Sequence, residues 1–80
     1  MRWVDVGDDH LVWLRETPDD AVLVHVGRSG HSPVAVQLTR LGYTNAERIA
    51  GSPQTSVDHL GASNLTLGAD APGWQILNVD

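Results

Sequence analysis

The strongest constraint on what this chain can fold into is an apolar pattern with a period of two residues. His10–Glu16 and Ala21–Gly27 are short runs rich in β-branched and aromatic residues, as strands are. Residues 17–20, Thr-Pro-Asp-Asp, lie between the runs and have the composition of a turn, because Pro presets a turn dihedral and Asp bonds to nearby backbone donors. The sequence therefore predicts a β-hairpin over 10–27.

The second of these runs is apolar on both of its faces. One face carries Val22, Val24 and Val26, and the other carries Ala21, Leu23 and His25. An antiparallel strand with one face in water alternates apolar and polar residues, so a strand without that alternation is typical of the middle of a sheet. We expect residues 21–27 to form a central strand.

Further short runs follow. After Pro33, a third strand places Val34, Val36 and Leu38 inward. Residues 39–45 indicate a loop with one helical turn. Residues 46–50 fit a strand or a helical turn, with the strand favoured, and 56–60, 64–67 and 74–79 predict three more strands. Six or seven short strands separated by Gly and Pro are typical of an antiparallel sandwich or barrel. We expect one domain over 1–80, with residues 1–9 as a lead-in segment.

The chain is close to the lower size limit for an independent domain. Its 80 residues are expected to bury apolar area equivalent to on the order of 117 kcal/mol, against about 120 kcal/mol of conformational entropy. There is no Cys, so neither a disulfide nor a thiolate zinc site can add stability. A partner surface is therefore an expected source of stability.

Charge and composition exclude several classes of function. The net charge is −5 and the five Arg residues are scattered, so no basic stripe is present for nucleic acid or an anionic membrane. The absence of Lys excludes Schiff-base chemistry and a P-loop. No apolar run is long enough to span a membrane or to act as a signal peptide.

No motif in the chain predicts a catalytic residue. Residues 30–34, Gly-His-Ser-Pro-Val, partly match a nucleophile elbow around Ser32, but the second Gly is missing and no strand-turn-helix pattern surrounds it; the frame 27–31 fails in the same way. The carboxylate pairs 8–9 and 19–20 are adjacent in turns and cannot straddle a substrate as glycosidase carboxylates do. Asp5 with the pair 8–9 lacks the ligand alternation of a calcium loop.

Four histidines raise the alternative of a metal site, because imidazoles near carboxylates bind zinc or iron. They are His10, His25, His31 and His59. No two have the i,i+2 strand spacing or the i,i+4 helix spacing that would aim two rings at one point. We expect His25 to be structural, and no metal site and no cofactor are predicted.

Three tryptophans and no Phe are the unusual aromatic feature of the chain. Trp13 lies among apolar residues in the middle of a predicted strand and is expected in the core. Trp3 and Trp74 are the candidate carbohydrate-binding residues, because exposed Trp stacks on pyranose rings in sugar-binding modules. The alternative for both is burial in this core or under a neighbouring domain. Asn64-Leu65-Thr66 matches the glycosylation sequon, which matters only for a secreted chain.

The order of these elements resembles a known family. Leu11–Glu16, the Pro-Asp-Asp turn and Val22–Ser29 look like the start of the C-terminal β-domain of the α-amylase superfamily, glycoside hydrolase family 13. Residues 33–36, 46–51, 65–67 and 73–77 resemble its later strands. Gly27-Arg28 stands where members often have Asn, and the resemblance, which covers most of 10–79, is a pattern of strands rather than a chemical motif.

The resemblance implies a Greek-key β-sandwich that follows a catalytic TIM barrel. The family's catalytic carboxylates lie on that barrel, so none is carried onto this chain. The implied function is a non-catalytic C-terminal domain of an α-glucan-active glycoside hydrolase, of the α-amylase or α-glucosidase type, that packs on the barrel and stabilises it. The expected partners are this barrel and an α-glucan, with a homodimer when the chain is isolated. The alternatives are an autonomous carbohydrate-binding module using Trp3 or Trp74, and a small interaction protein unrelated to sugars.

Overall fold

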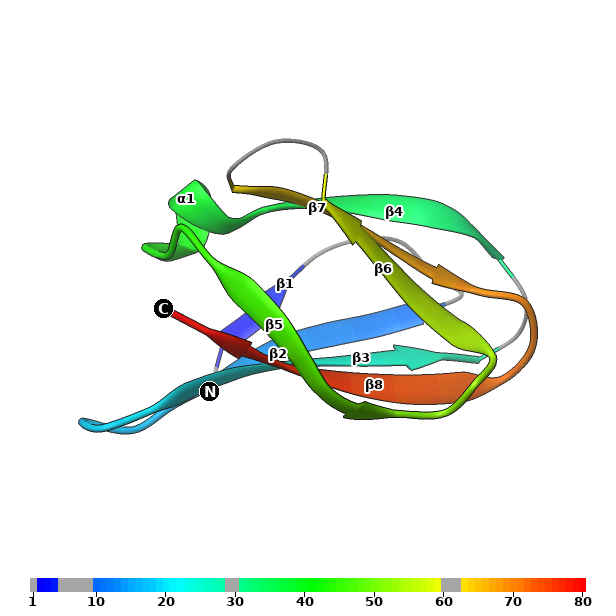
Figure 1. Ribbon diagram of the computed structural model, residues 1–80, viewed down its shortest axis with the longest axis horizontal. Helices are drawn as coiled ribbons and strands as arrows, with labels where there is room; N and C mark the ends of the chain where they lie inside the picture. Colours follow the sequence, from blue (N-terminus) through cyan, green and yellow to red (C-terminus); the bar gives the residue numbers. More distant parts are fainter. Residues whose placement is uncertain (1, 5–9, 29–30, 60–62) are drawn as a thin grey trace.

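The computed structural model describes residues 2–4, 10–28, 31–59 and 63–80, with only the backbone of His31, Ser32 and His59. These residues form eight strands and one short helix (Figure 1). The elements are β1 (Arg2–Val4), β2 (His10–Glu16), β3 (Ala21–Gly27), β4 (His31–Gln37), α1 (Leu38–Leu41), β5 (Ala46–Gly51), β6 (Thr55–His59), β7 (Asn64–Ala69) and β8 (Gly73–Val79). None of the helical structure described is long and apolar enough to cross a membrane.

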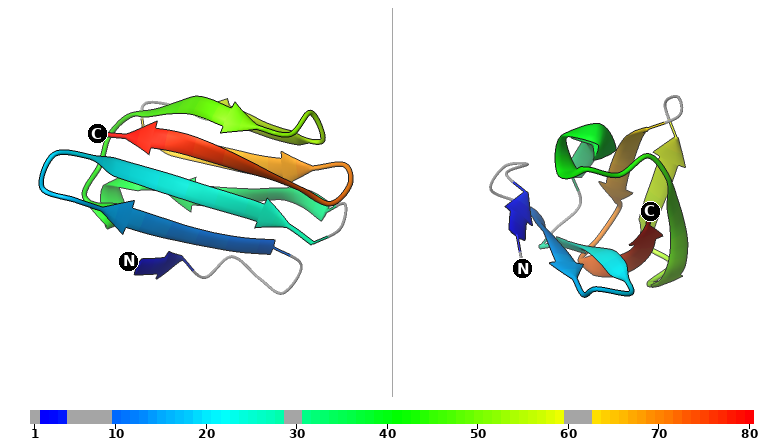
Figure 2. Two further views of the ribbon diagram at one scale, coloured as in Figure 1. Left: turned by 90° about the horizontal axis from the view of Figure 1, so that it is seen from below. Right: turned by 90° about the vertical axis from the view of Figure 1, so that its left-hand side faces the viewer.

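The strands form two antiparallel sheets packed face to face. The larger sheet has the order β1-β2-β3-β8-β5 and the smaller one β4-β7-β6 (Figure 2). The chain passes from the larger sheet to the smaller one after β3 and again after β5, so β8 returns between β3 and β5 late in the sequence. The expected all-β Greek-key sandwich is confirmed, with β3 central in its sheet as predicted.

Three local predictions differ from the structure. Residues 2–4, expected within a lead-in segment, form strand β1, which pairs with β2 and packs Val4 against the core. Three residues are too few to show an alternating pattern. Strand β4 begins at His31 rather than after Pro33, and Leu38 opens helix α1 instead of ending the strand. Leu38 still points inward and is fully buried.

The core lies between the two sheets and is mainly aliphatic. Its members are Val12, Leu14, Ala21, Leu23, Val36, Leu38, Leu65, Leu67, Leu77 and Val79. After α1 the chain turns at Gly42, which adopts a φ of 92° that favours glycine and lets the Tyr43 N–H bond to the Leu38 carbonyl at 3.0 Å. This turn brings Tyr43 to the end of the sandwich where β1 and β2 lie.

A buried polar pair interrupts the aliphatic core. His25 on β3 and Gln75 on β8 are cross-strand partners, and both are fully buried. The Gln75 Nε2 lies 3.0 Å from His25 Nδ1 and donates to the Ser56 carbonyl of β6 at 2.8 Å. Because a carbonyl can only accept, this atom must be the amide nitrogen, so His25 Nδ1 is an acceptor. The pair thus connects the two sheets.

Polar side chains also close the sandwich along β5 and β6. The Arg48 guanidinium donates to the Thr55 carbonyl at 2.8 Å and to the Ser52 carbonyl at 2.9 Å. It lies over Gly51, where an added Cβ would come within 2.5 Å of Arg48 Nη2 and 2.8 Å of Gln75 Cβ. The right-hand panel of Figure 2 shows β5 bridging the two sheets on this side.

Candidate docking face

The exposed side of the five-stranded sheet is the most unusual surface of the described structure, and we call it the outer face. Alternation along β2, β3 and β8 turns one set of side chains into the core and the other set outward. The left-hand panel of Figure 2 looks directly onto this side of the sheet. Its apolar residues are Trp3, Leu11, Trp13, Val22, Val24, Val26, Trp74 and Ile76.

Strand register arranges these residues in rows across the sheet. The first row is Trp3, Trp13, Val24, Ile76 and Ala50, on β1, β2, β3, β8 and β5. The second row is Leu11, Val26 and Trp74. A third row, toward one end of the sheet, is Arg15, Val22, Asn78 and Glu47. The outer face therefore has an apolar centre with a polar border on one side, the arrangement typical of an interface.

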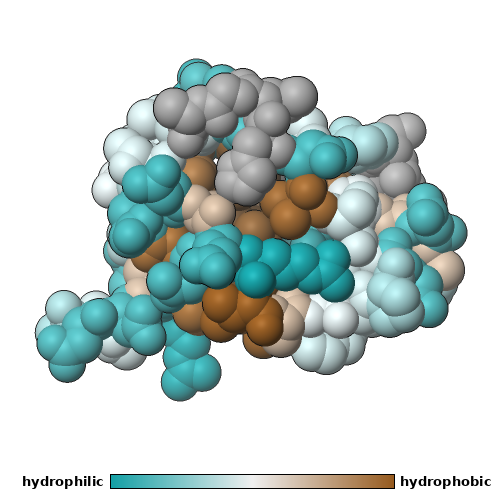
Figure 3. All heavy atoms as spheres, viewed as in Figure 1, coloured by the Kyte–Doolittle hydropathy of each residue, from teal (hydrophilic) through white to brown (hydrophobic). Residues whose placement is uncertain are grey.

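Two tryptophans project furthest from the outer face. Trp3 is 61% exposed and Trp74 is 46% exposed. With about 250 Å² for a tryptophan side chain, these two residues alone leave about 270 Å² of mainly apolar surface in water. Leu11, which is 43% exposed, and the half-buried residues between the two tryptophans extend this apolar patch. Figure 3 views the sandwich from the side of β5 and β6 rather than onto the outer face, and hydrophobic atoms reach the surface on that side as well, where Ile49 of β5 is 57% exposed.

Trp13 is not in the core, which corrects the prediction for this residue. It faces outward on β2, is half-buried and packs against Trp3, with ring centroids 5.4 Å apart and planes tilted by 51°. This offset, tilted geometry is favourable for aromatic pairs. The apolar neighbours that suggested a core position belong to both faces of β2, and sequence alone could not tell which face Trp13 takes.

Among the residues that the structure describes, none at the centre of the outer face is charged. The two apolar rows contain no ionisable residue, and the third row contributes one Arg and one Glu. The whole chain nevertheless carries a net charge of −5. A partner for this face is therefore expected to be apolar and uncharged rather than basic, because no negative field lies at its centre to attract cations.

A polar cluster holds the edge strand β1 beside the outer face, and we call it the clamp. Arg2 Nε bonds to Glu16 Oε1 at 2.8 Å, and Arg2 Nη2 donates to the Leu41 carbonyl at 2.7 Å. The Tyr43 hydroxyl donates to Glu16 Oε2. The clamp thus joins the first two strands to α1 and the turn after it.

The clamp shifts the ionisation of two of its members. The Tyr43 hydroxyl and then Arg2 stabilise the Glu16 carboxylate, so the pKa of Glu16 lies below its usual range. The same hydrogen bond favours the protonated phenol and raises the pKa of Tyr43. Both shifts favour the state in which a neutral phenol donates to a charged carboxylate.

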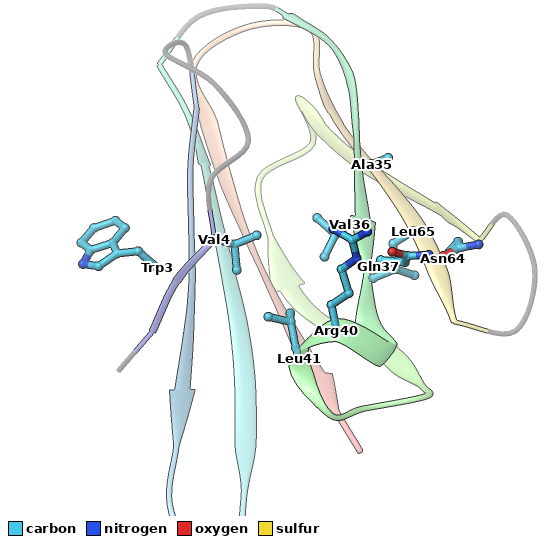
Figure 4. Close-up of a pocket in the computed structure, with 9 residues that line it drawn as sticks. All are labelled: Trp3, Val4, Ala35, Val36, Gln37, Arg40, Leu41, Asn64 and Leu65. Atoms are coloured by element: carbon cyan, nitrogen blue, oxygen red, sulfur yellow. The ribbon is translucent and has the colours of Figure 1, made fainter.

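A cavity of about 650 Å³ lies between β1 and β4, and residues of both strands, including Trp3 and Val4 of β1, line it. Val4, Val36 and Leu41 point toward one another within it, whereas Trp3 points away (Figure 4). Gln37, Arg40 and Asn64 line its polar part. The cavity shows that β1 separates two apolar environments, with Val4 facing one and Trp3 the other.

The other residues considered as sites are dispersed. His10 and His25 are buried on the inner face of the larger sheet, and Asp19 and Asp20 are exposed in the β2–β3 turn. Within the described parts of the chain, no group of three or more His, Asp or Glu side chains could hold a metal ion.

Some of these predictions cannot be compared with the structure. Ser32 lies in strand β4 rather than in a strand-to-helix turn, with only its backbone described. Asp5, Asp8 and Asp9 lie outside the described residues, as do the side chains of His31 and His59.

Sequence reasoning missed two contributors to this face. Leu11 and Ile76 were treated only as members of apolar strands, yet they complete the rows between the tryptophans. It also missed the clamp, because Arg2, Glu16 and Tyr43 are far apart in the chain and form no motif. The signal that was present is the all-valine face of β3, which has no polar residue to place in water.

Comparison of this chain with models of known protein families, with curated proteins and with solved structures finds no match.

Proposed function

We propose that this chain is a non-catalytic β-sandwich domain that packs on a larger catalytic domain and stabilises it. The partner that we propose is the TIM barrel of an α-glucan-active glycoside hydrolase, as the sequence resemblance implies. The observation that carries the proposal is the outer face, an apolar surface with an uncharged centre that carries Trp3, Trp13 and Trp74 on three strands of the larger sheet. A surface of this kind is typical of an interface.

The inner core supports the same interpretation. The sandwich already has a core of its own between the sheets, so the outer face is not needed to complete the fold of this chain. Apolar residues on both sides of β3 and β8 are expected when a second layer covers the sheet. A catalytic barrel is surrounded by an outer ring of helices, and the outer face would pack against part of that ring.

The test uses the catalytic barrel of an α-amylase-superfamily enzyme from the same organism, expressed without its C-terminal β-domain. Adding this chain should raise the melting temperature of the barrel and slow its loss of maltodextrin hydrolysis on heating. The chain alone should hydrolyse neither maltodextrin nor a nitrophenyl glucoside. An unchanged melting temperature, or turnover by the chain alone, would contradict the proposal.

Carbohydrate binding is the second candidate function, and one observation favours it: both candidate tryptophans are exposed on the same face. They lie three strands and two residues apart, which places their Cα atoms about 16 Å from each other. A single pyranose can therefore contact only one of them. Titration of tryptophan fluorescence with maltooligosaccharides tests this function, and a saturable change lost in Trp74→Ala would establish it.

A further inference from the structure

We propose that the outer face has two anchors with different support: Trp74 is fixed by the sheet, whereas Trp3 is held in place by the clamp of Arg2, Glu16 and Tyr43. This inference rests on the proposed function and adds positioning residues to it. It predicts that polar residues pointing away from the partner control how well the partner binds. The partner surface is taken to be the uncharged, apolar exterior of a folded domain.

Hydrogen bonds of its backbone hold Trp74 in place. It lies on β8, between β3 and β5, and its cross-strand partner is Val26. Its carbonyl accepts from the Ser52 N–H at 2.8 Å and from the Thr55 hydroxyl at 3.1 Å, and its N–H donates to Ser52 Oγ at 3.1 Å. Two neighbouring strands and these bonds leave the position of Trp74 independent of any exposed side chain.

Trp3 has much weaker support. Strand β1 is an edge strand with three residues, and β2 is its one neighbour in the sheet. Short edge strands have few backbone hydrogen bonds, and most of the Trp3 side chain is in water. Among the described residues, β1 also contacts the ring of Trp13 through Trp3 and borders the cavity around Val4.

The clamp adds side-chain hydrogen bonds to β1, which has few backbone hydrogen bonds of its own. Arg2 is adjacent to Trp3, and its two hydrogen bonds run in different directions, to Glu16 of β2 and to the Leu41 carbonyl of α1. A guanidinium fixed at two points determines the orientation of its own backbone segment more strictly than one contact would. The Tyr43 hydroxyl holds the Glu16 carboxylate that receives Arg2.

The side chains of the clamp are exposed, so the clamp is not expected to act as an ion pair that stabilises the whole fold. The Arg2 and Glu16 side chains are 47% and 36% exposed, and pairs at such sites contribute little to global stability. Removing the clamp is therefore expected to leave the melting temperature of the isolated chain almost unchanged. Its effect should appear in the geometry of Trp3 and in binding.

The first part of the experiment measures the position of Trp3 in the isolated chain. Two indole rings in close contact, such as those of Trp3 and Trp13, give an exciton couplet in circular dichroism. Trp3→Ala must remove this couplet. We expect Arg2→Ala to reduce the couplet to less than half, and Arg2→Lys to restore part of it because Lys keeps the charge and can make one of the two bonds. Arg40→Ala is the matched control, since Arg40 is an exposed arginine outside the clamp. An unchanged couplet in Arg2→Ala overturns the inference.

The second part measures association with the same barrel that tests the proposed function. We expect Trp74→Ala and Trp3→Ala each to weaken binding about tenfold or more, as central aromatic residues of interfaces do. Arg2→Ala should weaken it about three- to tenfold. In a Trp3→Ala background, Arg2→Ala should have no further effect, because the clamp acts through Trp3.

The outcomes separate the two proposals. If the wild-type chain does not associate with the barrel, the proposed function fails, and the inference fails with it. If the wild type binds and Arg2→Ala binds equally well, only the inference is overturned. If Arg2→Ala weakens binding as strongly without Trp3 as with it, Arg2 contacts the partner directly and the positioning role is wrong.

Discussion

The inner and outer faces of the five-stranded sheet each carry residues that water alone would place on the other face. The inner face, which is buried, includes His10, His25 and Gln75 among its aliphatic residues. The outer face of the same strands has Trp, Val, Leu and Ile at its centre. The comparison shows that each face carries residues whose polarity does not match their exposure in the isolated chain.

Different physical reasons make each face acceptable. On the inner face, the Gln75 amide bonds to His25 and to the Ser56 carbonyl, which offsets the cost of burying polar groups. On the outer face no such compensation exists, because water in contact with indole and aliphatic groups is unfavourable whatever their neighbours. The inner face is therefore largely satisfied within this chain, with Gln75 Oε1 a buried acceptor that lacks a partner among the described residues, whereas the outer face leaves apolar side chains in water.

The largest effect expected from this comparison is between two adjacent residues of β8. Leu77→Ala removes a fully buried side chain of the inner face and should lower the free energy of unfolding by about 2–5 kcal/mol. Ile76→Ala, on the half-buried outer face, should cost about 1 kcal/mol in the isolated chain. Urea unfolding of both variants measures the difference. Equal losses would mean that the outer face already contributes a core of its own.

The buried polar pair provides the next test. Gln75→Leu keeps the volume but removes the donor for the Ser56 carbonyl and His25 Nδ1, so it should cost about 1–3 kcal/mol. Gln54→Leu, at an exposed glutamine in the β5–β6 turn, is the matched control and should change stability by less than about 0.5 kcal/mol. A Gln75→Leu chain more stable than the wild type would show that the inner face tolerates apolar replacement.

Self-association of the isolated chain tests the outer face without a partner. Because the exposed apolar rows have no charge, sedimentation at increasing concentration should show reversible dimers. Trp74→Arg should reduce that association about tenfold while changing stability by about 0.5 kcal/mol or less. Asp58→Asn, an equal change of charge at an exposed residue of β6 in the other sheet, should leave the dimer intact. Equal effects of both variants would assign the association to net charge.

The smallest effect is the pH dependence of the clamp. Because the pKa of Glu16 is lowered in the folded chain, its contribution to stability is complete above its ordinary value of 4.5 and is lost as the pH falls through the lower folded value. The pKa of Tyr43 is raised, so its contribution is complete below 10.0 and is lost as the pH rises through the higher folded value.

A single substitution, Glu16→Gln, removes the pH dependence that the Glu16–Tyr43 hydrogen bond causes in both acid and alkali. The melting temperature of Glu16→Gln should lie slightly below that of the wild type at neutral pH and approach it in strong acid and strong alkali. The difference should be small because the group is exposed. A constant difference across the whole pH range would show that the carboxylate charge is not involved.

The sequence predicted the β2–β3 hairpin and most later strands because their signals are local. Alternation, Pro and the Thr17–Asp20 turn all lie within a few residues of one another, and the Thr17 N–H bonds to the Asp20 carbonyl at 2.8 Å as the turn requires. Strand β1 could not be predicted in this way. Its three residues become a strand because β2 offers an edge and Arg2 reaches Glu16 and Leu41, which are distant in the chain.

The candidate site was predicted only in part. Composition identifies Trp3 and Trp74 as candidates, but their position on a common face depends on β8 lying beside β3. That pairing brings together residues that are 50 positions apart in the sequence, such as His25 and Gln75. Trp13 was assigned to the core because an apolar strand does not reveal which of its faces turns inward. That choice is made by the register of the whole sheet.

By itself, the sequence determined that this chain is a small all-β protein with a strand that is apolar on both sides, because side-chain alternation is a property of each strand alone. The tertiary structure decided which side is buried, which tryptophans share a face and how Trp3 is held. These depend on pairing between distant strands and on one sheet covering the other. The sandwich has two sheets and therefore covers only one face of each, which leaves the apolar outer face of β3 and β8 in water unless a partner covers it, as we propose.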